Sequence, residues 1–361
     1  MKPTQQLHDL GQSIWLDNIT RGILNDGTLQ RYIDEYSVTG LTSNPTIFEQ
    51  AIEKGDLYDE AIRRLATEGA SGDSLFFALA IEDLTRAADL FSPIHRATNG
   101  GDGWVSLEVS PLLAHDAVRT VAEARSLHER AKRANLFIKI PGTTEGVVAI
   151  EEAIFAGVPI NVTLLFSHLQ YLSAAEAYLR GIERRIAANL DPVVPSVASL
   201  FVSRWDKAVQ STVPRELRNR LGIAVASRTY RACRELERSA RWRSVIEAGA
   251  RPQRLLWAST GTKDPQASDV LYVEALAAPG TINTIPEATL HAFADHGRVH
   301  PTLAIDGGDG DETIAEFEKA GIRVDPLAAD LQQEGAEAFV RSWKDLLGII
   351  AGKAAVLTAA R

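Results

Sequence analysis

Short apolar runs alternate with longer amphipathic stretches along almost the whole chain. Each run has about five residues, the usual length of a β-strand, and the longer stretches, such as 145–155 and 168–188, carry apolar residues at helical spacing. This pattern predicts eight strands, at residues 13–17, 38–42, 105–109, 136–140, 160–164, 197–201, 254–258 and 281–285.

Alternating strands and helices are typical of a parallel sheet with crossover helices. Eight such units predict an α/β fold, a (β/α)8 TIM barrel, which usually needs about 250 residues. The chain has 361 residues. We therefore expect one barrel domain over residues 1–361, with helical insertions around 45–103 and a helical C-terminal tail at about 291–361. A doubly wound open sheet is less favoured, because Asp17–Thr20 after the first strand is not a glycine-rich turn.

Polar side chains interrupt the strands, mostly toward their C-terminal ends. Because strand side chains alternate between two faces, the apolar set should face the helices: Leu107, Val109, Leu136, Ile138, Ile140, Val162, Leu164 and Leu200. The other set should face the barrel interior: Asp17, Ser106, Glu108, Phe137, Lys139, Asn161, Thr163, Ser199 and Phe201. In a TIM barrel, the C-terminal ends of the strands form the active site.

Lys139 is the most informative of these residues. An ammonium group among Phe137, Ile138 and Ile140 is costly to bury, and desolvation favours the neutral amine, which can attack a carbonyl group. One alternative is a lysine whose ammonium reaches solvent at the strand end. Another is a structural ion cluster in which Asp17 and Glu108 neutralise Lys139. A lysine with two carboxylates on one inner surface favours Schiff-base chemistry of the class I aldolase type.

Composition and charge narrow the choice of function. The formal net charge of −9 argues against nucleic-acid binding. No apolar run is long enough for a membrane span, and residues 1–6 lack a signal-peptide core, so we expect a soluble, cytoplasmic protein. Cys233 is the only cysteine, which excludes an intramolecular disulfide. Schiff-base chemistry needs no metal, and the histidines do not gather at strand ends as zinc ligands would, so we expect no metal and no cofactor.

Four segments, in order, resemble signatures of the transaldolase family. The segment 40–48, with Thr42–Pro45 at its centre, resembles the second-strand signature, and 135–143 resembles the segment around the Schiff-base lysine. Residues 161–167 and 198–204 resemble the fifth- and sixth-strand motifs. The similarity covers about 13–284, and the length and the segment 257–263 resemble the longer bacterial subfamily.

The resemblance implies a role for each matching position. Lys139 corresponds to the Schiff-base lysine, Asp17 to the acid/base at the cleaved bond, and Glu108 and Thr163 to the pair that holds the catalytic water. The implied substrate-binding residues are Asn44, Asn161, Ser199, Phe201 and Arg204, of which Arg204 binds phosphate. The implied enzyme is a transferase of the non-oxidative pentose phosphate pathway. It moves a dihydroxyacetone unit from sedoheptulose 7-phosphate to glyceraldehyde 3-phosphate, giving erythrose 4-phosphate and fructose 6-phosphate.

One departure from the family pattern concerns phosphate binding. Many transaldolases carry a second arginine just after the seventh strand, but 258–263 contains none. Our hypothesis is that Lys263, with Ser259 or backbone amides, takes this role as a point charge. A solvated loop lysine is the alternative.

Two other functions remain open at this point. A fructose 6-phosphate aldolase shares the lysine but releases dihydroxyacetone. Those shorter enzymes carry Gln and Tyr at the positions of Glu108 and Phe201, which favours transfer for this chain. The other function is a non-catalytic sugar-phosphate-binding barrel. The sequence leaves the oligomeric state open, a homodimer included, and the helical segment 334–355 could pack on the barrel, cover the pocket or meet a partner.

Overall fold

The computed structural model describes residues 1–299 and 303–359. Residues 300–302 and 360–361 of the predicted tail lie outside this description. Eight strands are hydrogen-bonded in chain order and close into a parallel barrel: β1 (Ser13–Leu16), β2 (Val38–Leu41), β3 (Val105–Glu108), β4 (Leu136–Pro141), β5 (Ile160–Leu165), β6 (Ser196–Phe201), β7 (Arg254–Ala258) and β8 (Ile282–Ile285). The predicted TIM barrel is confirmed, and the predicted strand ends are correct to within one residue.

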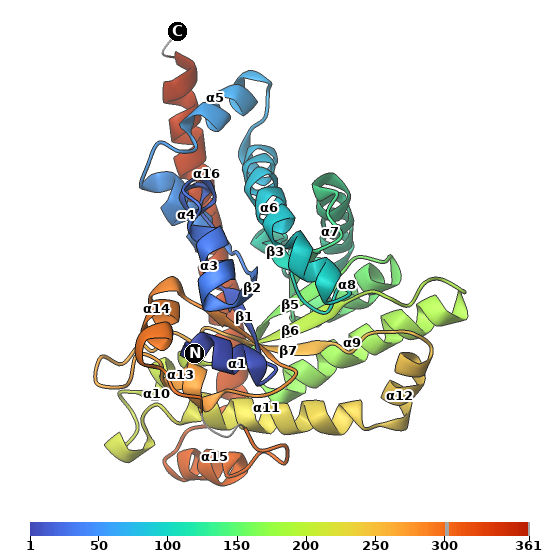
Figure 1. Ribbon diagram of the computed structural model, residues 1–361, viewed down its shortest axis with the longest axis vertical. Coiled ribbons are helices and arrows are strands. Elements are labelled where there is room, and N and C mark those ends of the chain that lie inside the picture. The colour runs from blue at the N-terminus through green and yellow to red at the C-terminus, as the bar shows by residue number, and fades with distance from the viewer. Residues whose placement is uncertain (300–302, 360–361) are drawn as a thin grey trace.

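Helices surround the barrel (Figure 1). Those before β5 are α1 (Pro3–Asp9), α2 (Arg21–Asn25), α3 (Thr28–Tyr36), α4 (Pro45–Glu53), α5 (Asp59–Thr67), α6 (Gly72–Ala97), the 3-10 turn η1 (Pro111–Leu113), α7 (Ala117–Ala131) and α8 (Thr144–Phe155). Those after β5 are α9 (His168–Ala187), α10 (Ser203–Val209), η2 (Arg215–Leu217), α11 (Leu221–Glu237), α12 (Ala240–Glu247), α13 (Leu271–Ala275), α14 (Glu287–His296), α15 (Gly310–Lys319) and α16 (Val324–Ala359). Among these helices, none combines the length and the apolar character that a membrane span requires.

Several helices begin directly after a strand because a polar residue caps them. Asn44, Thr143 and Ser167 follow β2, β4 and β5, and each side chain accepts a hydrogen bond from the backbone three residues later. Such caps satisfy backbone donors that the first helical turn leaves free. The chain therefore turns sharply at the C-terminal end of these strands and leaves that end of the barrel accessible.

The strand faces follow the predicted alternation, with one exception. Phe137 lies inside the barrel, stacked on Trp104 with ring centroids 4.1 Å apart, while Ile138 and Ile140 pack among the helices. The prediction for Leu164 is wrong. Its φ is +57° and the register with β6 shifts between Val162 and Leu165, so the bulge turns Leu164 toward the aromatic cluster of Phe166. Leu165 takes the outer position instead.

The C-terminal helix α16 has 36 residues and is about 54 Å long. It contacts α4, α5 and α6 and reaches β5, and Figure 1 shows it rising beside α4 and α5 to the C-terminus. Trp343 packs edge-on against Phe76 of α6, at 4.8 Å between ring centroids. The last helix and the helices between β2 and β3 therefore share one apolar core.

Candidate active site

The C-terminal ends of the strands enclose a small cavity of about 130 Å³, called here the inner cavity. Nine predicted site residues line it: Asp17, Asn44, Lys139, Thr163, Ser199, Phe201, Arg204, Ser259 and Lys263. The other lining residues are Thr42, Ala258, Gly261, Thr284, Pro286 and Phe339. Glu108 and Asn161 lie one layer behind and hydrogen-bond to residues of the inner face. The structure thus brings all eleven predicted residues to one end of the barrel.

Lys139 points from β4 into this cavity and is only 5% exposed. Its Nζ donates to Glu108 Oε2 at 3.0 Å and to the backbone carbonyl of Ser43 at 2.9 Å. The register places Glu108 directly beside Lys139 on the neighbouring strand. Burial raises the pKa of the Glu108 carboxyl, although the Lys139 charge opposes the rise. Proton transfer along the 3.0 Å bond therefore converts an ion pair into a neutral acid and a neutral amine.

Asp17 follows β1 on the opposite side of the cavity. Its Oδ1 accepts a hydrogen bond from Thr42 Oγ1 at 3.0 Å, and Thr42 also contacts Thr284 Oγ1 at 2.7 Å. Desolvation raises the pKa of the Asp17 carboxyl, and the charge of Lys139 opposes this increase. A carboxyl group with a raised pKa accepts a proton more readily than an ordinary aspartate, as a general acid/base must before it returns the proton.

A chain of hydrogen bonds crosses the floor of the cavity. Ser199 Oγ donates to Asn161 Oδ1 at 2.7 Å, and Asn161 Nδ2 donates to Ser106 Oγ at 3.1 Å. These bonds fix the amide orientation of Asn161. Thr163 Oγ1 is buried and has no hydrogen-bond partner within the described residues. A buried hydroxyl without a partner is suited to binding a water molecule or a substrate hydroxyl.

Asn44 and Phe201 form parts of the cavity wall. The Asn44 Oδ1 atom accepts the bond from Ile47 that caps α4, so its Nδ2 group is the donor left for a ligand. The Phe201 ring lies 5.3 Å from that of Phe166 and 5.2 Å from the Arg204 guanidinium carbon. Phe201 therefore lies between the apolar wall of the inner cavity and the Arg204 guanidinium.

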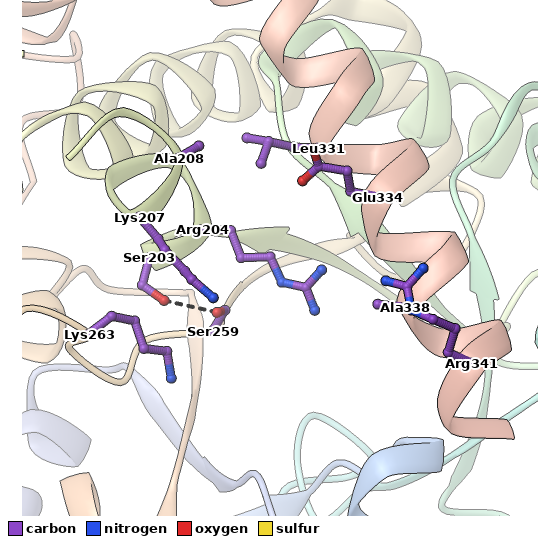
Figure 2. A pocket seen from close by; sticks show the side chains of 10 residues that line it. All are labelled: Ser203, Arg204, Lys207, Ala208, Ser259, Lys263, Leu331, Glu334, Ala338 and Arg341. Carbon is purple, nitrogen blue, oxygen red and sulfur yellow. Dashed lines mark hydrogen bonds between the residues drawn. The ribbon is translucent and has the colours of Figure 1, made fainter. Parts of the chain in front are cut away.

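A wider cavity of about 560 Å³ adjoins the inner cavity and is called here the outer mouth (Figure 2). It is lined by Ser203, Arg204, Lys207, Ala208, Ser259, Lys263, Leu331, Glu334, Ala338 and Arg341. Four cations and one carboxylate thus surround a space that suits a phosphate group. Arg204, Ser259 and Lys263 line both cavities. The mouth therefore leads directly to Lys139.

The outer mouth lies between α10 on one side and α16 on the other. Figure 2 shows Arg204 and Lys207 on α10 and Glu334 and Arg341 on α16 facing them. Ser259 Oγ lies 2.9 Å from Ser203 Oγ, which ties the loop after β7 to α10. Burial lowers the pKa of the Arg204 guanidinium, and the carboxylates of Glu334 and Glu108 oppose this change.

Sequence reasoning did not identify several residues of these cavities. Thr42 stands inside the second-strand motif, and Lys207 follows Arg204 by one helical turn, so both had a local signal. Phe339, Glu334 and Arg341 had none, because α16 reaches the site only through tertiary packing. Within residues 1–299 and 303–359, no three His, Cys, Asp or Glu side chains gather in a way that could hold a metal ion.

Comparison with known proteins agrees with the geometry. The model of the transaldolase/fructose-6-phosphate aldolase family matches residues 14–350. A transaldolase of Thermobifida fusca is 44% identical, with 99% of each chain covered. Transaldolases of an Arthrobacter species and of Thiobacillus denitrificans are 43% and 42% identical, with 97% of this chain covered in each and 97% and 100% of theirs.

These relatives confirm the transaldolase function and the transferase class predicted from the sequence. The chain belongs to the transaldolase/fructose-6-phosphate aldolase family.

Proposed function

We propose that the enzyme transfers a dihydroxyacetone unit from sedoheptulose 7-phosphate to glyceraldehyde 3-phosphate. The products are erythrose 4-phosphate and fructose 6-phosphate, and the reaction belongs to the non-oxidative pentose phosphate pathway. One observation carries the proposal: buried Lys139 shares a 3.0 Å hydrogen bond with Glu108 in the cavity that Asp17 also lines. Relatives named transaldolase over nearly the full length support it further.

Lys139 is the nucleophile of the proposed reaction. Glu108 takes a proton from Nζ, and the neutral amine attacks the C2 carbonyl of the donor sugar. Glu108 returns the proton as the carbinolamine loses water, which leaves an iminium ion on Lys139. Thr163 Oγ1, buried and without a partner among the described residues, is suited to hold the water that carries these protons.

Asp17 is the acid/base of carbon–carbon cleavage. It removes the proton of the C4 hydroxyl, the C3–C4 bond breaks, and its electron pair neutralises the iminium as an enamine. An aldose phosphate leaves, and the enamine then attacks the aldehyde carbon of the acceptor. Asp17 returns its proton to the new hydroxyl, and water hydrolyses the iminium to free Lys139. The hydrogen bond from Thr42 holds the Asp17 carboxyl in place for both transfers.

The remaining cavity residues bind the sugar. Asn44 Nδ2 and Ser199 line the cavity and supply polar groups for hydroxyls, together with Asn161, which lies behind Ser199 and accepts its hydrogen bond. Phe201 forms an apolar side of the dihydroxyacetone end. Arg204, Ser259 and Lys263 lie where the inner cavity opens into the outer mouth, which suits a phosphate at the far end of the sugar. Phosphorylated sugars are therefore the substrate class.

Borohydride trapping tests the Schiff base. The enzyme is incubated with fructose 6-phosphate and borohydride, and the adduct is located by peptide mass. We expect one adduct, on Lys139; its absence there would refute the mechanism. Formation of sedoheptulose 7-phosphate from fructose 6-phosphate and erythrose 4-phosphate demonstrates transfer, whereas release of free dihydroxyacetone alone would indicate an aldolase.

We propose that residues 1–361 form a single domain, which is supported by the packing of α16 against both the barrel and the helices between β2 and β3. A cytoplasmic location stays a prediction, and the oligomeric state stays open, a homodimer included.

A further inference from the structure

A buried glycine lies in the interior of the long helix α16, next to residues that line the outer mouth. Gly335 has its neighbours Glu334 and Ala336 in regular helix, so no turn requires glycine there. Glycine is a poor helix former, and alanine is the best. A buried glycine in a helix interior therefore indicates that something lies too close for a side chain.

The close neighbours of Gly335 are two side chains of the site region. A Cβ atom at this position would lie 2.9 Å from Leu164 Cδ2 and 3.1 Å from Arg204 Nη1. Both distances are shorter than the roughly 3.5–4.0 Å of ordinary contact between non-bonded carbon atoms. The α16 backbone thus forms the surface against which the Arg204 guanidinium rests.

The helix is fixed in this position by bonds on either side of the contact. Gln332 Nε2 donates to the carbonyl oxygens of Gly142 and Leu164, both at 2.9 Å. One turn past Gly335, Phe339 lines the inner cavity, and the Ser342 hydroxyl lies 2.8 Å from that of Thr46. Since α16 is held at these points, a new side chain at 335 would displace Arg204 and Leu164 rather than the helix.

Packing is what positions Arg204. Within the described residues, its guanidinium group forms no hydrogen bond and no ion pair, although the residue is half-buried. It lies between the ring of Phe201, 5.2 Å from the centroid, and the backbone at Gly335. The guanidinium donors therefore stay free for a ligand in the outer mouth, where Figure 2 shows Arg204 extending from α10 toward the space between the helices.

We propose that Gly335 is a positioning residue that holds Arg204 over the mouth and thereby sets the preference for phosphorylated sugars. The inference rests on the proposed phosphate-binding role of Arg204. This role gives α16 a part in substrate selection, although the helix is far from Lys139 along the chain.

The test is Gly335→Ala, with Gly348→Ala and Gly352→Ala as matched controls. All three glycines lie in α16, but a Cβ at 348 or 352 has no neighbour within 4 Å. We expect Gly335→Ala to raise KM for fructose 6-phosphate about tenfold, the scale of one weakened charge-assisted hydrogen bond. The kcat, and the rate measured with unphosphorylated fructose in parallel, should stay near wild type. The control variants should leave both constants unchanged and melt at a slightly higher temperature.

A double-mutant cycle with Arg204→Met separates positioning from a general packing effect. If Gly335 acts through Arg204, adding Gly335→Ala to Arg204→Met raises KM no further. A full additional tenfold rise, or an equal loss of kcat on both sugars, contradicts the proposal. Should Gly335→Ala fold poorly, Gly335→Ala/Leu164→Ala relieves the closer contact and keeps the one with Arg204, with Leu164→Ala as its reference.

Calorimetric titration with inorganic phosphate separates this inference from the proposed function. Gly335→Ala should weaken phosphate binding by a similar factor whether or not an adduct forms on Lys139. A normal adduct with unchanged phosphate affinity in the variant overturns the role of Gly335 and leaves the proposed function intact. If no adduct forms on Lys139 but the variant binds phosphate more weakly, the proposed function is overturned and the role of Gly335 stands.

Discussion

The inner cavity and the outer mouth are built in different ways. The inner cavity is formed mainly by strand ends and the loops that follow them, and Lys139 and Glu108 are each no more than 6% exposed. The outer mouth is formed by two helices and a loop, and it presents long cationic side chains. Its Arg341 is 67% exposed and Glu334 is also exposed. The first region is fixed by hydrogen bonds between neighbouring strands, and the second by the packing of a remote helix.

This difference predicts separate roles for the two regions, proton transfer in the inner cavity and phosphate binding in the outer mouth. A group that must change protonation during the reaction needs a dry, hydrogen-bonded site, because solvent would screen its neighbours. A phosphate, in contrast, needs only several cations at suitable distances, and it is bound mainly as a charge. Substitutions in the inner cavity should therefore lower kcat, and those in the outer mouth should raise KM.

The largest effect is expected for Lys139→Met. Loss of a covalent nucleophile should reduce kcat by about 10⁴-fold or more, and it should abolish the borohydride adduct. The measurement is steady-state transfer together with adduct mass. Because Glu108 is left buried without its partner, unfolding of the variant is followed by circular dichroism, which must show a folded protein for the comparison to stand.

Lys207→Met is the matched control in the outer mouth. It removes the same charge from a lysine that lines only the wider cavity. The adduct on Lys139 should form normally, and only KM for phosphorylated sugars should rise. A loss of kcat comparable to that of Lys139→Met would show that the two regions do not have separate roles.

Asp17→Asn should have the next largest effect and should separate two steps within the inner cavity. An amide cannot accept the C4 hydroxyl proton, so kcat should fall by about 10²–10⁴-fold, the usual contribution of general acid/base catalysis. Schiff-base formation does not need this proton transfer. The borohydride adduct should therefore still form, as single-turnover trapping measures, and an adduct that disappears with activity would assign Asp17 to the earlier step.

The two regions also differ in how well the sequence predicts them. Face alternation placed Lys139, Asn161, Thr163 and Ser199 on one inner surface, because strand geometry has a period of two and little freedom. The same rule failed at Leu164, where a bulge with positive φ reverses the alternation. No local signal marks that bulge, since leucine rarely adopts this conformation.

The outer mouth was predicted only in part. Arg204 lies within a family motif, and Ser259 and Lys263 follow β7, where a phosphate-binding group is expected. Glu334 and Arg341 come from a helix whose docking depends on contacts far apart in sequence. Helical periodicity gives one apolar face for 334–355, which fits packing on a barrel, covering a pocket or meeting a partner equally well. The hydrogen bonds of Gln332 to Gly142 and Leu164 place the helix on the barrel, and Phe339 lines the inner cavity. The sequence pattern of neither segment predicts these contacts.

Lys263→Ala tests the cation that follows β7 in the outer mouth, and its effect should be smaller. If Lys263 takes the place of the second phosphate-binding arginine, KM for phosphorylated sugars should rise about five- to tenfold, with kcat unchanged. The rise should shrink as salt is added, because a partly exposed charge is screened. Initial rates at two ionic strengths measure both. Unchanged KM at low salt would show that Lys263 is a solvated loop residue.

The smallest effect concerns the pH dependence of stability and a buried carboxylate that anchors α10, the helix that carries two cations of the outer mouth. Asp206, between Arg204 and Lys207 along this helix, points away from the mouth and is 4% exposed. Its carboxylate accepts hydrogen bonds from Leu221 N at 2.9 Å, Gly222 N at 3.2 Å and the Tyr272 hydroxyl at 2.8 Å. Burial nevertheless raises the pKa of Asp206 to about 6.

A raised folded-state pKa has a definite sign for stability. The folded protein binds the Asp206 proton more tightly than the unfolded chain, so this stabilisation is fully present below the ordinary pKa of an aspartate and is lost as pH rises through about 6. From about pH 5 to about pH 7.5, Asp206 should cost about 1 kcal/mol of unfolding free energy. Asp206→Asn is less stable overall, because its amide nitrogen cannot accept a bond from Gly222, but it lacks this pH dependence. Urea unfolding of both proteins over that range measures how the unfolding free energy of each changes with pH. If the two dependences are parallel, Asp206 stays ionised and its three hydrogen-bond donors outweigh the cost of burial. In that case α10 is anchored by a fixed charge.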